Sequence, residues 1–502
     1  MTELDVLRFF PPGSLAERIA RFVRDQGVEA YLVGGYVRDA LLGRPSHDLD
    51  FVILGRALVI ARRMANHFGA AFYALDAERD TGRVIFRQGE RQELFYVDFA
   101  AARGGSLAAD LALRDFTINA IAVRLDGAQV VDPHGGRADL SAGLLRAVSD
   151  RAFRDDPLRT LRGVRLAAEL GFEVEPRTEA LLRQAAPLLG DVSAERARDE
   201  LCKLLALPGA AHSLRRLSEF GLLAVLLPEV EALRGVTQST PHQLDVFEHT
   251  LETVRWTEEI IAAVQPGQQS ALAALGLSSL SRFPLAAHLA ERTSGGRTRA
   301  ILLKLTALLH DVGRPAARTV EPDGRIRLFD LAQGEFLSHE QRGATLAARA
   351  LTRLRFSVQE VRLVQAVVAN HMRSMFMSSR QLPSRRAIYR FFRDIGEAGV
   401  DVAFLALADY RAAWGAALVH ERWAHLVEVI TLLLTHWYEQ HEQTIAPPKL
   451  ISGRDLIERF GLEEGPRIGE LLEAVREAQV MGQVRTREEA LAWVERILIA
   501  GE

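Results

Sequence analysis

Residues 31–52, YLVGGYVRDALLGRPSHDLDFV, decide how the N-terminal part of this chain folds. An apolar run ends at the glycine pair 34–35, a helix-like VRDALLG follows, and Asp48-Leu49-Asp50 opens a second apolar run. Residues two apart share a face of a strand, so we expect Asp48 and Asp50 to point together while Leu49 faces the core. The alternative is a solvated strand end with two ordinary aspartates. The nearby glycine pair favours a metal-assisted phosphoryl-transfer site, because such a turn is open enough to receive phosphate.

Length and composition indicate a multidomain protein. The 502 residues exceed what one hydrophobic core supports, about 250–300 residues, so we expect about three or four domains. Cys202 is the only cysteine, which excludes an intrachain disulfide. We find neither a signal peptide nor an apolar stretch near the roughly 20 residues of a membrane helix, and we expect a cytoplasmic protein without membrane association. The net charge of −3 means that an RNA partner must be inferred from motifs.

Hydrophobic periodicity predicts an α/β head followed by helices. We expect helices over 14–26 and 56–69 and strands over 29–34, 48–54, 71–75, 83–88 and 93–99. The head should end near residue 125, and the pattern is almost entirely helical after residue 155. We expect residues 266–300 to form a loop or insertion of undefined role, and Ala446-Pro447-Pro448 to be a linker.

Several motifs in order carry a family resemblance. The glycine pair followed by Asp-x-Asp resembles the nucleotidyltransferase superfamily. LRDFTINA at Leu113–Ala120, DDPLRTLRGVRLAAELGF at Asp155–Phe172 and SAERARDELCKLL at Ser193–Leu205 are similar to motifs of class II tRNA nucleotidyltransferases (CCA-adding enzymes and their relatives) and bacterial poly(A) polymerases. The resemblance covers roughly residues 15–235.

This resemblance implies a catalytic carboxylate set of Asp48, Asp50 and Asp98. Asp48 and Asp50 would hold Mg²⁺, which favours carboxylate and triphosphate oxygens. Asp98, on the predicted strand 93–99, would complete the metal set or orient the attacking hydroxyl; a purely structural carboxylate is the alternative. The implied reaction is in-line attack of an RNA 3′-hydroxyl on the α-phosphate of CTP or ATP, with pyrophosphate leaving.

The resemblance also implies a nucleotide-binding set. Contacts to triphosphate and ribose are expected from Gly34, Gly35, Arg38, Asp39, Arg114, Asp115 and Asn119. Base selection is expected from Asp156 and Arg159, with Arg162 and Arg165 extending the same helix face. The alternatives are a surface ion pair at Arg38-Asp39, a capped helix start at Asp115 or Thr117, an ordinary helix start at Asp156-Pro157, and a solvated arginine stripe. Leu113 stands where the family has its first motif arginine, so one phosphate or RNA contact is missing or relocated.

The segment between Asp98 and Asp110 is short. Typical CCA-adding relatives carry a longer flexible loop here, which helps the switch from C to A addition. A shortened loop resembles the enzymes that add only CC, and it is also compatible with an A-adding enzyme or a poly(A) polymerase. Complete CCA addition therefore remains the broad prediction and CC addition a subcase.

Histidines and aspartates of the second half resemble the HD phosphohydrolase superfamily. In LLHDVG, His310-Asp311 is flanked along the chain by further histidines and by Ala408-Asp409-Tyr410. The resemblance implies one divalent metal held by His249, His310, Asp311 and Asp409, and a second metal held by His339 and His371. Imidazole with carboxylate suits Mn, Ni, Fe or Zn, and a phosphoester substrate is expected. The alternative is a decayed scaffold without metal.

Together these features predict four parts. We expect an α/β nucleotidyltransferase head with a small mixed sheet (1–125), an all-α neck and body (126–240), an all-α HD domain (241–445) and a small helical C-terminal segment (446–502) that contacts tRNA or packs. The expected partners are a tRNA 3′ end and nucleoside triphosphates, and the oligomeric state is left open. The alternatives to a CCA-adding enzyme are a CC- or A-adding specialist, a poly(A) polymerase, or an HD phosphohydrolase whose head only binds nucleotide.

Overall fold

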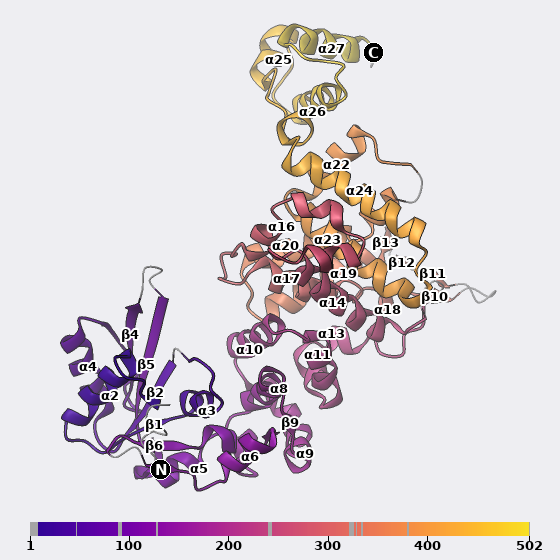
Figure 1. Cartoon of the computed structure of the whole chain (residues 1–502). Coiled ribbons are helices and arrows are strands. Elements are labelled where there is room, and N and C mark those ends of the chain that lie inside the picture. Colours follow the sequence, from indigo (N-terminus) through magenta and orange to yellow (C-terminus); the bar gives the residue numbers. More distant parts are fainter. Residues whose placement is uncertain are drawn as a thin grey trace. The chain divides into compact units, whose positions relative to one another are not determined.

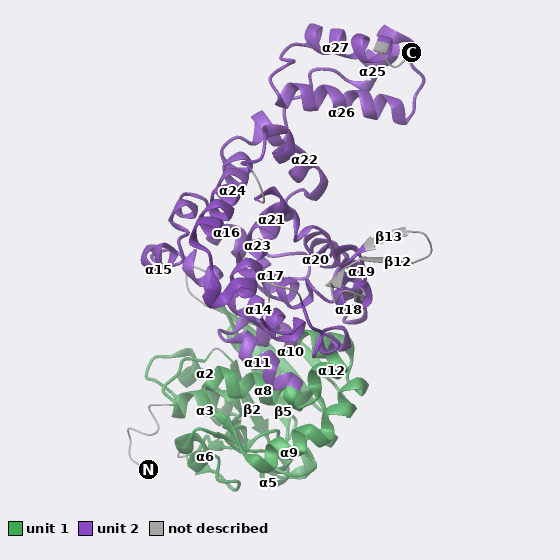
Figure 2. Cartoon of the chain, turned by 90° about the vertical axis from the view of Figure 1, so that its right-hand side faces the viewer, with its two compact units in different colours: residues 1–200, 219–226 green, residues 201–218, 227–502 purple. Residues whose placement is uncertain are grey.

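A computed structural model gives the arrangement of the chain (Figure 1). It describes residues 9–46, 48–88, 93–126, 129–238, 243–320, 326–327, 329–332, 335–378 and 381–500. The chain divides into two compact units (Figure 2), residues 1–200 with 219–226 and residues 201–218 with 227–502.

A mixed sheet organises the first unit. Its strands are β1 (Ala30–Val33), β2 (Asp48–Ile53), β3 (Ala71–Asp76), β4 (Thr81–Gln88), β5 (Glu93–Ala101), β6 (Ala122–Arg124) and β7 (Val130–Val131). The strand order is β3-β4-β5-β2-β1-β6-β7, with β2 and β5 parallel and the other neighbours antiparallel. The predicted mixed sheet is confirmed. It continues to β7, past the head boundary expected at residue 125.

Two amphipathic helices cover one face of this sheet. The helices and 3₁₀ turns of the head are α2 (Leu15–Asp25), α3 (Gly35–Leu41), α4 (Ala57–Phe68), η1 (Arg103–Gly105), α5 (Leu107–Ala112) and η2 (Thr117–Asn119). The Ser14 side chain caps α2 by accepting from the amide of Glu17. α4 packs on β4 and β5, and α2 packs on α4 (Figure 1). The helices predicted over 14–26 and 56–69 are confirmed.

The two faces of the sheet differ in what they bury. On one face, Leu49 is fully buried and Phe51 stacks on Phe99 with ring centroids 5.3 Å apart. On the other face, Val33 and Val52 join a core cluster with Leu111 of α5. Because strand pairing places Asp50 opposite Val33, the Asp-x-Asp carboxylates lie on this second face.

Helices complete the first unit. They are α6 (Gly136–Ala142), α7 (Ala152–Asp155), α8 (Leu158–Leu170), α9 (Pro176–Ala185), η3 (Ala186–Asp191) and α12 (Leu222–Leu226), with the short strands β8 (Leu144–Leu145) and β9 (Glu173–Val174). α10 (Ala194–Ala206) begins in the first unit and ends in the second. Gly163 lets α8 approach the LRDFTINA segment, since a Cβ there would lie 3.1 Å from Cζ of Phe116. This close approach brings α8 arginines to the head.

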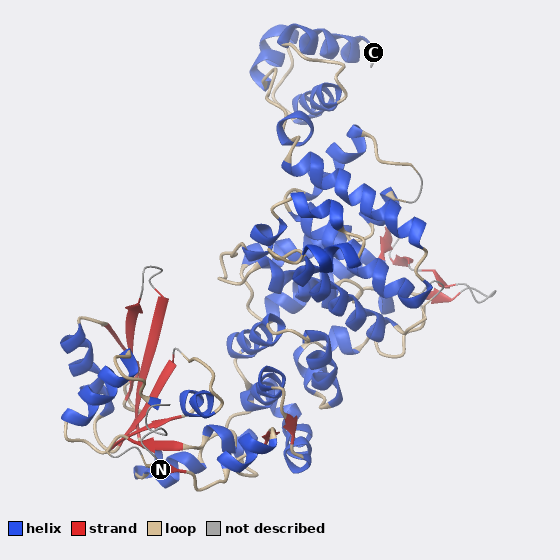
Figure 3. Ribbon diagram, in the orientation of Figure 1, coloured by secondary structure: helices blue, strands red, loops and turns tan. Residues whose placement is uncertain are grey.

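The second unit is helical with short strands at its edge (Figure 3). Its elements up to residue 445 are α11 (Ala210–Glu219), α13 (Pro228–Glu231), α14 (Val246–Ala263), α15 (Gln269–Ala274), η4 (Ser278–Arg282), α16 (Leu285–Ala290), α17 (Arg299–Leu309), α18 (Arg314–Ala317), β10 (Thr319–Val320), β11 (Ile326–Arg327), β12 (Phe329–Ala332), β13 (Glu335–Ser338), α19 (His339–Arg353), α20 (Val358–Asn370), α21 (Arg373–Met377), α22 (Arg385–Ile395), α23 (Ala398–Trp414), η5 (Gly415–Ala417), α24 (His420–Tyr438) and η6 (His441–Ile445). Helices α14, α17, α20 and α23 pack on one another and form its centre.

One expectation for this unit is wrong. Residues 266–300 are not a loop, because they contain α15, η4 and α16. Each of these helices is only five or six residues long and is separated from the next by glycine, serine or proline, which hides the helical period. Leu272, Leu280 and Leu285 are nevertheless buried. The segment therefore packs as part of the unit.

Three helices form the C-terminal segment: α25 (Gly453–Phe460), α26 (Pro466–Val480) and α27 (Arg487–Ala500). They follow Ala446-Pro447-Pro448, which is non-helical as predicted. They enclose their own core around Leu456 and Leu471. Arg386 of α22 donates to Glu477 of α26 at 2.8 Å, so the segment also contacts the preceding helices of the second unit. No described helix has the length and apolar character of a membrane span.

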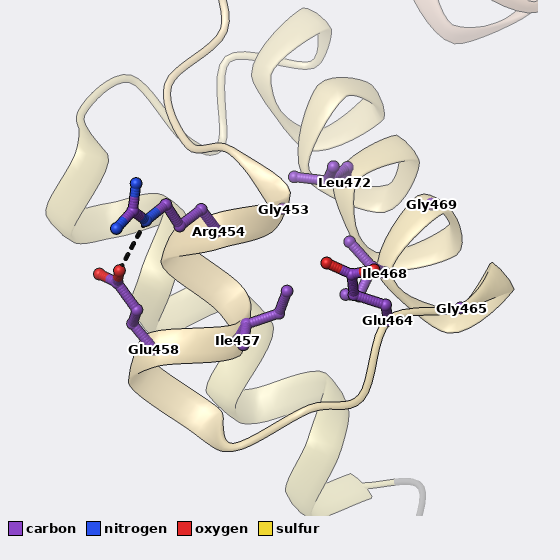
Figure 4. A pocket seen from close by; sticks show the side chains of 9 residues that line it. All are labelled: Gly453, Arg454, Ile457, Glu458, Glu464, Gly465, Ile468, Gly469 and Leu472. Atoms are coloured by element: carbon purple, nitrogen blue, oxygen red, sulfur yellow. Dashed lines mark hydrogen bonds and ion pairs between the residues drawn. The ribbon is translucent and has the colours of Figure 1, made fainter.

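A cavity of about 630 Å³ lies between α25 and α26 (Figure 4). Its wall combines the aliphatic side chains of Ile457 and Ile468 with the ion pair Arg454–Glu458, 2.8 Å between Nε and Oε1. Glu464 adds a second carboxylate to this wall. An acidic and apolar wall repels phosphate, so this cavity gives no support to the tRNA contact expected of the C-terminal segment.

Candidate functional site

The glycine turn and the Asp-x-Asp strand meet in the first unit. Gly34 has φ +76°, and a Cβ there would lie 2.9 Å from Oδ2 of Asp50 and 3.3 Å from Nη1 of Arg114. Only glycine therefore lets a carboxylate and a guanidinium approach the turn from both sides. Asp48 is exposed, and Leu49 is fully buried as predicted. Gly35 begins α3 directly after this turn.

Asp98 lies directly opposite Asp50 on the parallel strand β5. Both oxygens of Asp98 accept hydrogen bonds from Arg83 on β4, each at 2.7 Å. Asp98 thus shares the face of the Asp-x-Asp carboxylates, but its charge is balanced by a bidentate arginine. The geometry favours an orienting role for Asp98 over direct metal binding.

The carboxylates repel one another. Burial, followed by the charges of Asp98 and Asp48, raises the pKa of Asp50 to about 6, although Arg114 and Arg162 oppose the shift. A buried carboxylate with acidic neighbours is stabilised by a cation. The residues present therefore fit a divalent metal ion at Asp48 and Asp50.

A buried hydrogen-bond chain links α3 to α8. Arg38 donates to Oδ1 of Asn119 at 2.9 Å, and Asn119 donates to Asp115 at 3.0 Å. Arg162 of α8 pairs with Asp115 at 2.9 Å. Burial acts to raise the pKa of Asp115, but Arg162, Asn119 and the amide of Phe116 outweigh it and lower that pKa. The chain holds the LRDFTINA segment between head and neck.

This chain decides between two local alternatives. Arg38 does pair with Asp39, with 2.8 Å between Nε and Oδ1, but it is buried and not on the surface. Asp115 accepts from the amide next to it in the chain and does not cap a helix, and η2 has no side-chain cap. Arg38 and Asp115 are thus buried members of this hydrogen-bond chain.

Arg114 and Leu113 lie beside Arg103, which the sequence did not single out. Asp110 is buried and accepts from Arg114 and from Arg103, at 3.1 Å and 2.7 Å. Arg103 also donates to the carbonyl of Leu113 at 3.3 Å. The guanidinium of Arg103 therefore supplies positive charge close to where the family's first motif arginine is absent.

The expected base-selecting residues sit at the start of α8. Arg159 donates to the carbonyl of Leu113 at 2.8 Å and to the carbonyl of Arg114 at 3.2 Å. Asp156 accepts from the Leu158 amide at 3.3 Å, as at a helix start, and pairs with Arg196 at 2.9 Å. These two side chains thus lie beside the LRDFTINA segment, each with partners of its own.

Arg165 differs from the other α8 arginines. It pairs with Glu200 of α10 at 2.8 Å and with Glu169 of its own helix. Its partners lie on the helical side of the unit, which favours a role in packing over nucleotide contact.

The second unit gathers all six expected ligands. Among the described residues, the potential ligand atoms form two groups, and within each group these atoms lie within 4.8 Å of one another. The first group is His249, His310 and Asp409, and the second is Asp311, His339 and His371. All six side chains are buried. They come from α14, the ends of α17 and α20, the start of α19, and α23. The sequence placed Asp311 with the first group, whereas the structure places it between the two.

Asp311 bridges the groups. Its Oδ2 lies 3.3 Å from Nε2 of His310, and its Oδ1 lies 3.8 Å from Nε2 of His339 and 3.9 Å from Nε2 of His371. Nε2 of His249 is 3.0 Å from Oδ1 of Asp409. One carboxylate that faces both groups is the arrangement a two-metal site needs.

Backbone contacts orient the imidazoles. Nδ1 of His310 lies 2.8 Å from the carbonyl of Ala307, and Nδ1 of His371 lies 2.8 Å from the carbonyl of Val368. These contacts put the proton on Nδ1 and leave Nε2 as a lone-pair donor that faces the cluster. The Nε2 atoms of His310 and His371 have no hydrogen-bond partner among the described residues. Burial lowers the pKa of His339 to about 4, so its imidazole is neutral at pH 7. This donor set fits a transition metal.

Arg314, which the sequence did not single out, contacts this centre. Its Nε lies 2.7 Å from Oδ1 of Asp311, one turn further along the chain. Arg314 stands three residues after Asp311, and this i, i+3 spacing could have identified it from the sequence. Arg83 had a comparable signal, since it faces Asp98 across the β4–β5 hairpin.

Comparisons with known proteins match the parts of the chain that carry both sites. Family models match as the poly A polymerase head domain over residues 30–146, the probable RNA- and SrmB-binding site of polymerase A over 171–233, the HD domain over 246–414, and a putative tRNA nucleotidyltransferase domain 2 over 342–494. The chain is 37% identical over 477 residues to an A-adding tRNA nucleotidyltransferase of Deinococcus radiodurans, with 93% of this chain and 95% of the relative covered. The chain belongs to the tRNA nucleotidyltransferase family.

Other relatives of this family match over nearly the whole chain. A CC-adding tRNA nucleotidyltransferase of Geobacter sulfurreducens is 32% identical over 97% of this chain and 96% of the relative. One from Thermus thermophilus is 35% identical over 93% of each chain. Among solved structures, a CCA-adding enzyme in its apo form aligns with a TM-score of 0.63 at 21% identity, over 98% of this chain and 96% of that chain. This last match shows the shared fold.

A Gly34→Ala variant tests the turn geometry. The added Cβ meets Asp50 at 2.9 Å in a positive-φ position, so we expect nucleotide incorporation to fall at least ~100-fold through misplacement of reacting groups. Gly43→Ala is the matched control, because Gly43 has φ +68° with nothing within 4 Å of its Cβ. Steady-state incorporation of labelled nucleotide is the measurement. Equal activity of the two variants would contradict the assigned turn.

An Asp311→Asn variant tests the buried centre of the second unit. We expect the metal content of the purified protein, measured by inductively coupled plasma mass spectrometry after incubation with Mn²⁺ or Ni²⁺ and dialysis, to fall to background. The neutral amide keeps the shape of the carboxylate but bridges metals poorly. His420→Ala, at an exposed position of α24, should keep full metal content. Wild-type protein that retains no metal would overturn the assignment.

Proposed function

We propose that this protein is a template-independent nucleotidyltransferase that adds all or part of the terminal CCA to tRNA from CTP and ATP. The observation that carries the proposal is that acidic and basic side chains meet at the glycine turn. Asp50 and Arg114 both stand beside Gly34, and Asp48 lies two residues before Asp50 on β2. Acidic groups for metal and basic groups for triphosphate are what phosphoryl transfer requires. A tRNA substrate implies that the protein acts in the cytoplasm.

Mg²⁺ is the ion we propose at Asp48 and Asp50. When bound, it neutralises charge on the triphosphate and on the leaving pyrophosphate. The protein's own groups position the reactants: Asp98, held by Arg83, orients the 3′-hydroxyl, and Arg114 contacts phosphate. Arg38, Asp39, Asp115 and Asn119 position the ribose and the triphosphate as a connected set.

Base selection is assigned to Asp156 and Arg159. A carboxylate accepts from an exocyclic amine and a guanidinium donates to ring nitrogen or oxygen, which suits C and A. In the structure Arg159 donates to backbone carbonyls and Asp156 pairs with Arg196. These are partners that an incoming base can replace. Arg162 supports Asp156 and Arg159 indirectly, through its ion pair with Asp115.

We propose CC addition as the specialisation. In sequence, one A-adding and three CC-adding tRNA nucleotidyltransferases match over at least 93% of this chain, whereas the multifunctional CCA proteins of Neisseria and Pseudomonas match over 45–53% of it. Between β5 and α5 only residues 102–106 intervene, and Arg103 is tied to Asp110. This short, fixed connection leaves no long loop to support the switch from C to A. Complete CCA addition is the alternative.

A second activity, metal-dependent phosphoester hydrolysis, is proposed for the buried centre of the second unit. The bridging position of Asp311 between two histidine groups favours it. A transition metal such as Mn, Ni, Fe or Zn would be held by His249, His310 and Asp409, and a second by His339 and His371. When bound, such ions lower the pKa of water and so supply a nucleophile at neutral pH.

An Asp50→Asn variant tests the main proposal. Incorporation of CMP into tRNA should fall at least ~100-fold, since several kcal/mol of charge stabilisation is lost. Metal-dependent phosphoester hydrolysis by the second unit should remain. Asp126→Asn, an exposed aspartate after β6, is the control and should leave incorporation unchanged. Undiminished incorporation by Asp50→Asn would refute the site.

A further inference from the structure

A cluster of aromatic and arginine side chains lies on the second unit outside the metal centre. It is built from α14, the end of α23 and the start of α24, and comprises Trp256, Tyr410, Arg411, Trp414, Arg422 and Trp423. Cζ of Arg411 lies 4.1 Å from the ring centroid of Trp256 and 5.5 Å from that of Trp423. Cζ of Arg422 lies 5.7 Å from the ring of Trp414.

The aromatic rings form a continuous platform. The ring of Tyr410 lies 5.9 Å from that of Trp414 and 6.0 Å from that of Trp423, with interplanar angles of 32° and 29°. Trp423 is buried and donates to the carbonyl of Leu275 at 3.0 Å, which fixes the base of the platform. Trp414 and Tyr410 are half-buried.

The charges of this cluster are not balanced within the protein. Arg411 and Arg422 form no ion pair and no hydrogen bond with the residues that the structure describes, and Arg422 is exposed. Neighbouring Arg255, by contrast, pairs with Glu252 at 2.8 Å. The Tyr410 hydroxyl is buried without a hydrogen-bond partner among the described residues. Two unneutralised guanidinium groups and an unused hydroxyl are suited to phosphate.

We propose that this cluster binds an unpaired segment of the RNA substrate, with phosphate held by Arg411 and Arg422 and a base stacked on Trp414. Aromatic faces combined with arginines are the combination that single-stranded nucleic acid uses, because every base has a stacking face and every linkage has a charge. The inference rests on the proposed tRNA substrate. An acidic peptide would use the arginines but not the aromatic rings. Tyr410 directly follows Asp409, so the platform and the metal centre share α23.

An Arg411→Gln/Arg422→Gln double variant of the full chain tests the inference. We expect the dissociation constant for a tRNA transcript that ends before the CCA, measured by filter binding, to rise about 10-fold. The salt dependence of binding should weaken by about 0.7 in log–log slope for each lost phosphate contact. Trp414→Ala should weaken binding as well, while Trp414→Phe keeps a ring and should retain most of the affinity.

Controls separate this site from bulk charge and from misfolding. An Arg349→Gln/Arg362→Gln double variant removes the same charge from exposed positions on α19 and α20 and should bind tRNA as the wild type does. Melting temperatures of all variants should be similar. Equal tRNA affinity of the Arg411/Arg422 variant and the wild type, or an equal loss in the control, would overturn the inference. Wild-type protein that binds tRNA but adds no nucleotide would instead refute the proposed function.

Discussion

Repulsion among carboxylates on one face of a sheet is the constraint on which the nucleotidyltransferase head depends. Asp50 lies opposite Asp98 and two residues from Asp48, and this proximity together with burial raises its pKa to about 6. Asp98 is balanced by the bidentate contact from Arg83, and Arg114 and Arg162 offset the charge of Asp50 in part. The remaining negative charge is what a cation at Asp48 and Asp50 would balance. The repulsion between these neighbouring carboxylates therefore favours the binding of a metal ion.

In the second unit, buried polar side chains also converge on an acidic group. Asp311 is fully buried, and three imidazoles face it at 3.3–3.9 Å through Nε2. Backbone carbonyls take up Nδ1 of His310 and His371, so Nε2 is left for the centre. A decayed scaffold would have no need to keep six buried polar side chains converging on one volume. The preserved geometry therefore favours metal binding.

The sequence alone predicted what depends on local periodicity and on short motifs. Alternation in Asp48-Leu49-Asp50 places Leu49 in the core, and the spacing of apolar residues defines α2 and α4. Contacts between distant segments could not be predicted in this way. The linkage of Arg162 to Asp115 and the position of Arg103 beside Leu113 arise from packing of α8 and η1 on the LRDFTINA segment. The short helices of residues 266–300 also escaped detection, because each is too brief to show a helical period.

The most direct test of the central claim is nucleotide addition resolved at single-nucleotide length. Purified protein with Mg²⁺, CTP and ATP would be incubated with tRNA transcripts that end before the CCA, after one C and after two. The account predicts extension of the first two transcripts to CC and a stop there, with no addition to the third. Completion of CCA would contradict the proposed CC specialisation but keep the nucleotidyltransferase. Addition of A alone would contradict the proposed CC specialisation and indicate an A-adding enzyme. No addition to any transcript would contradict the central claim.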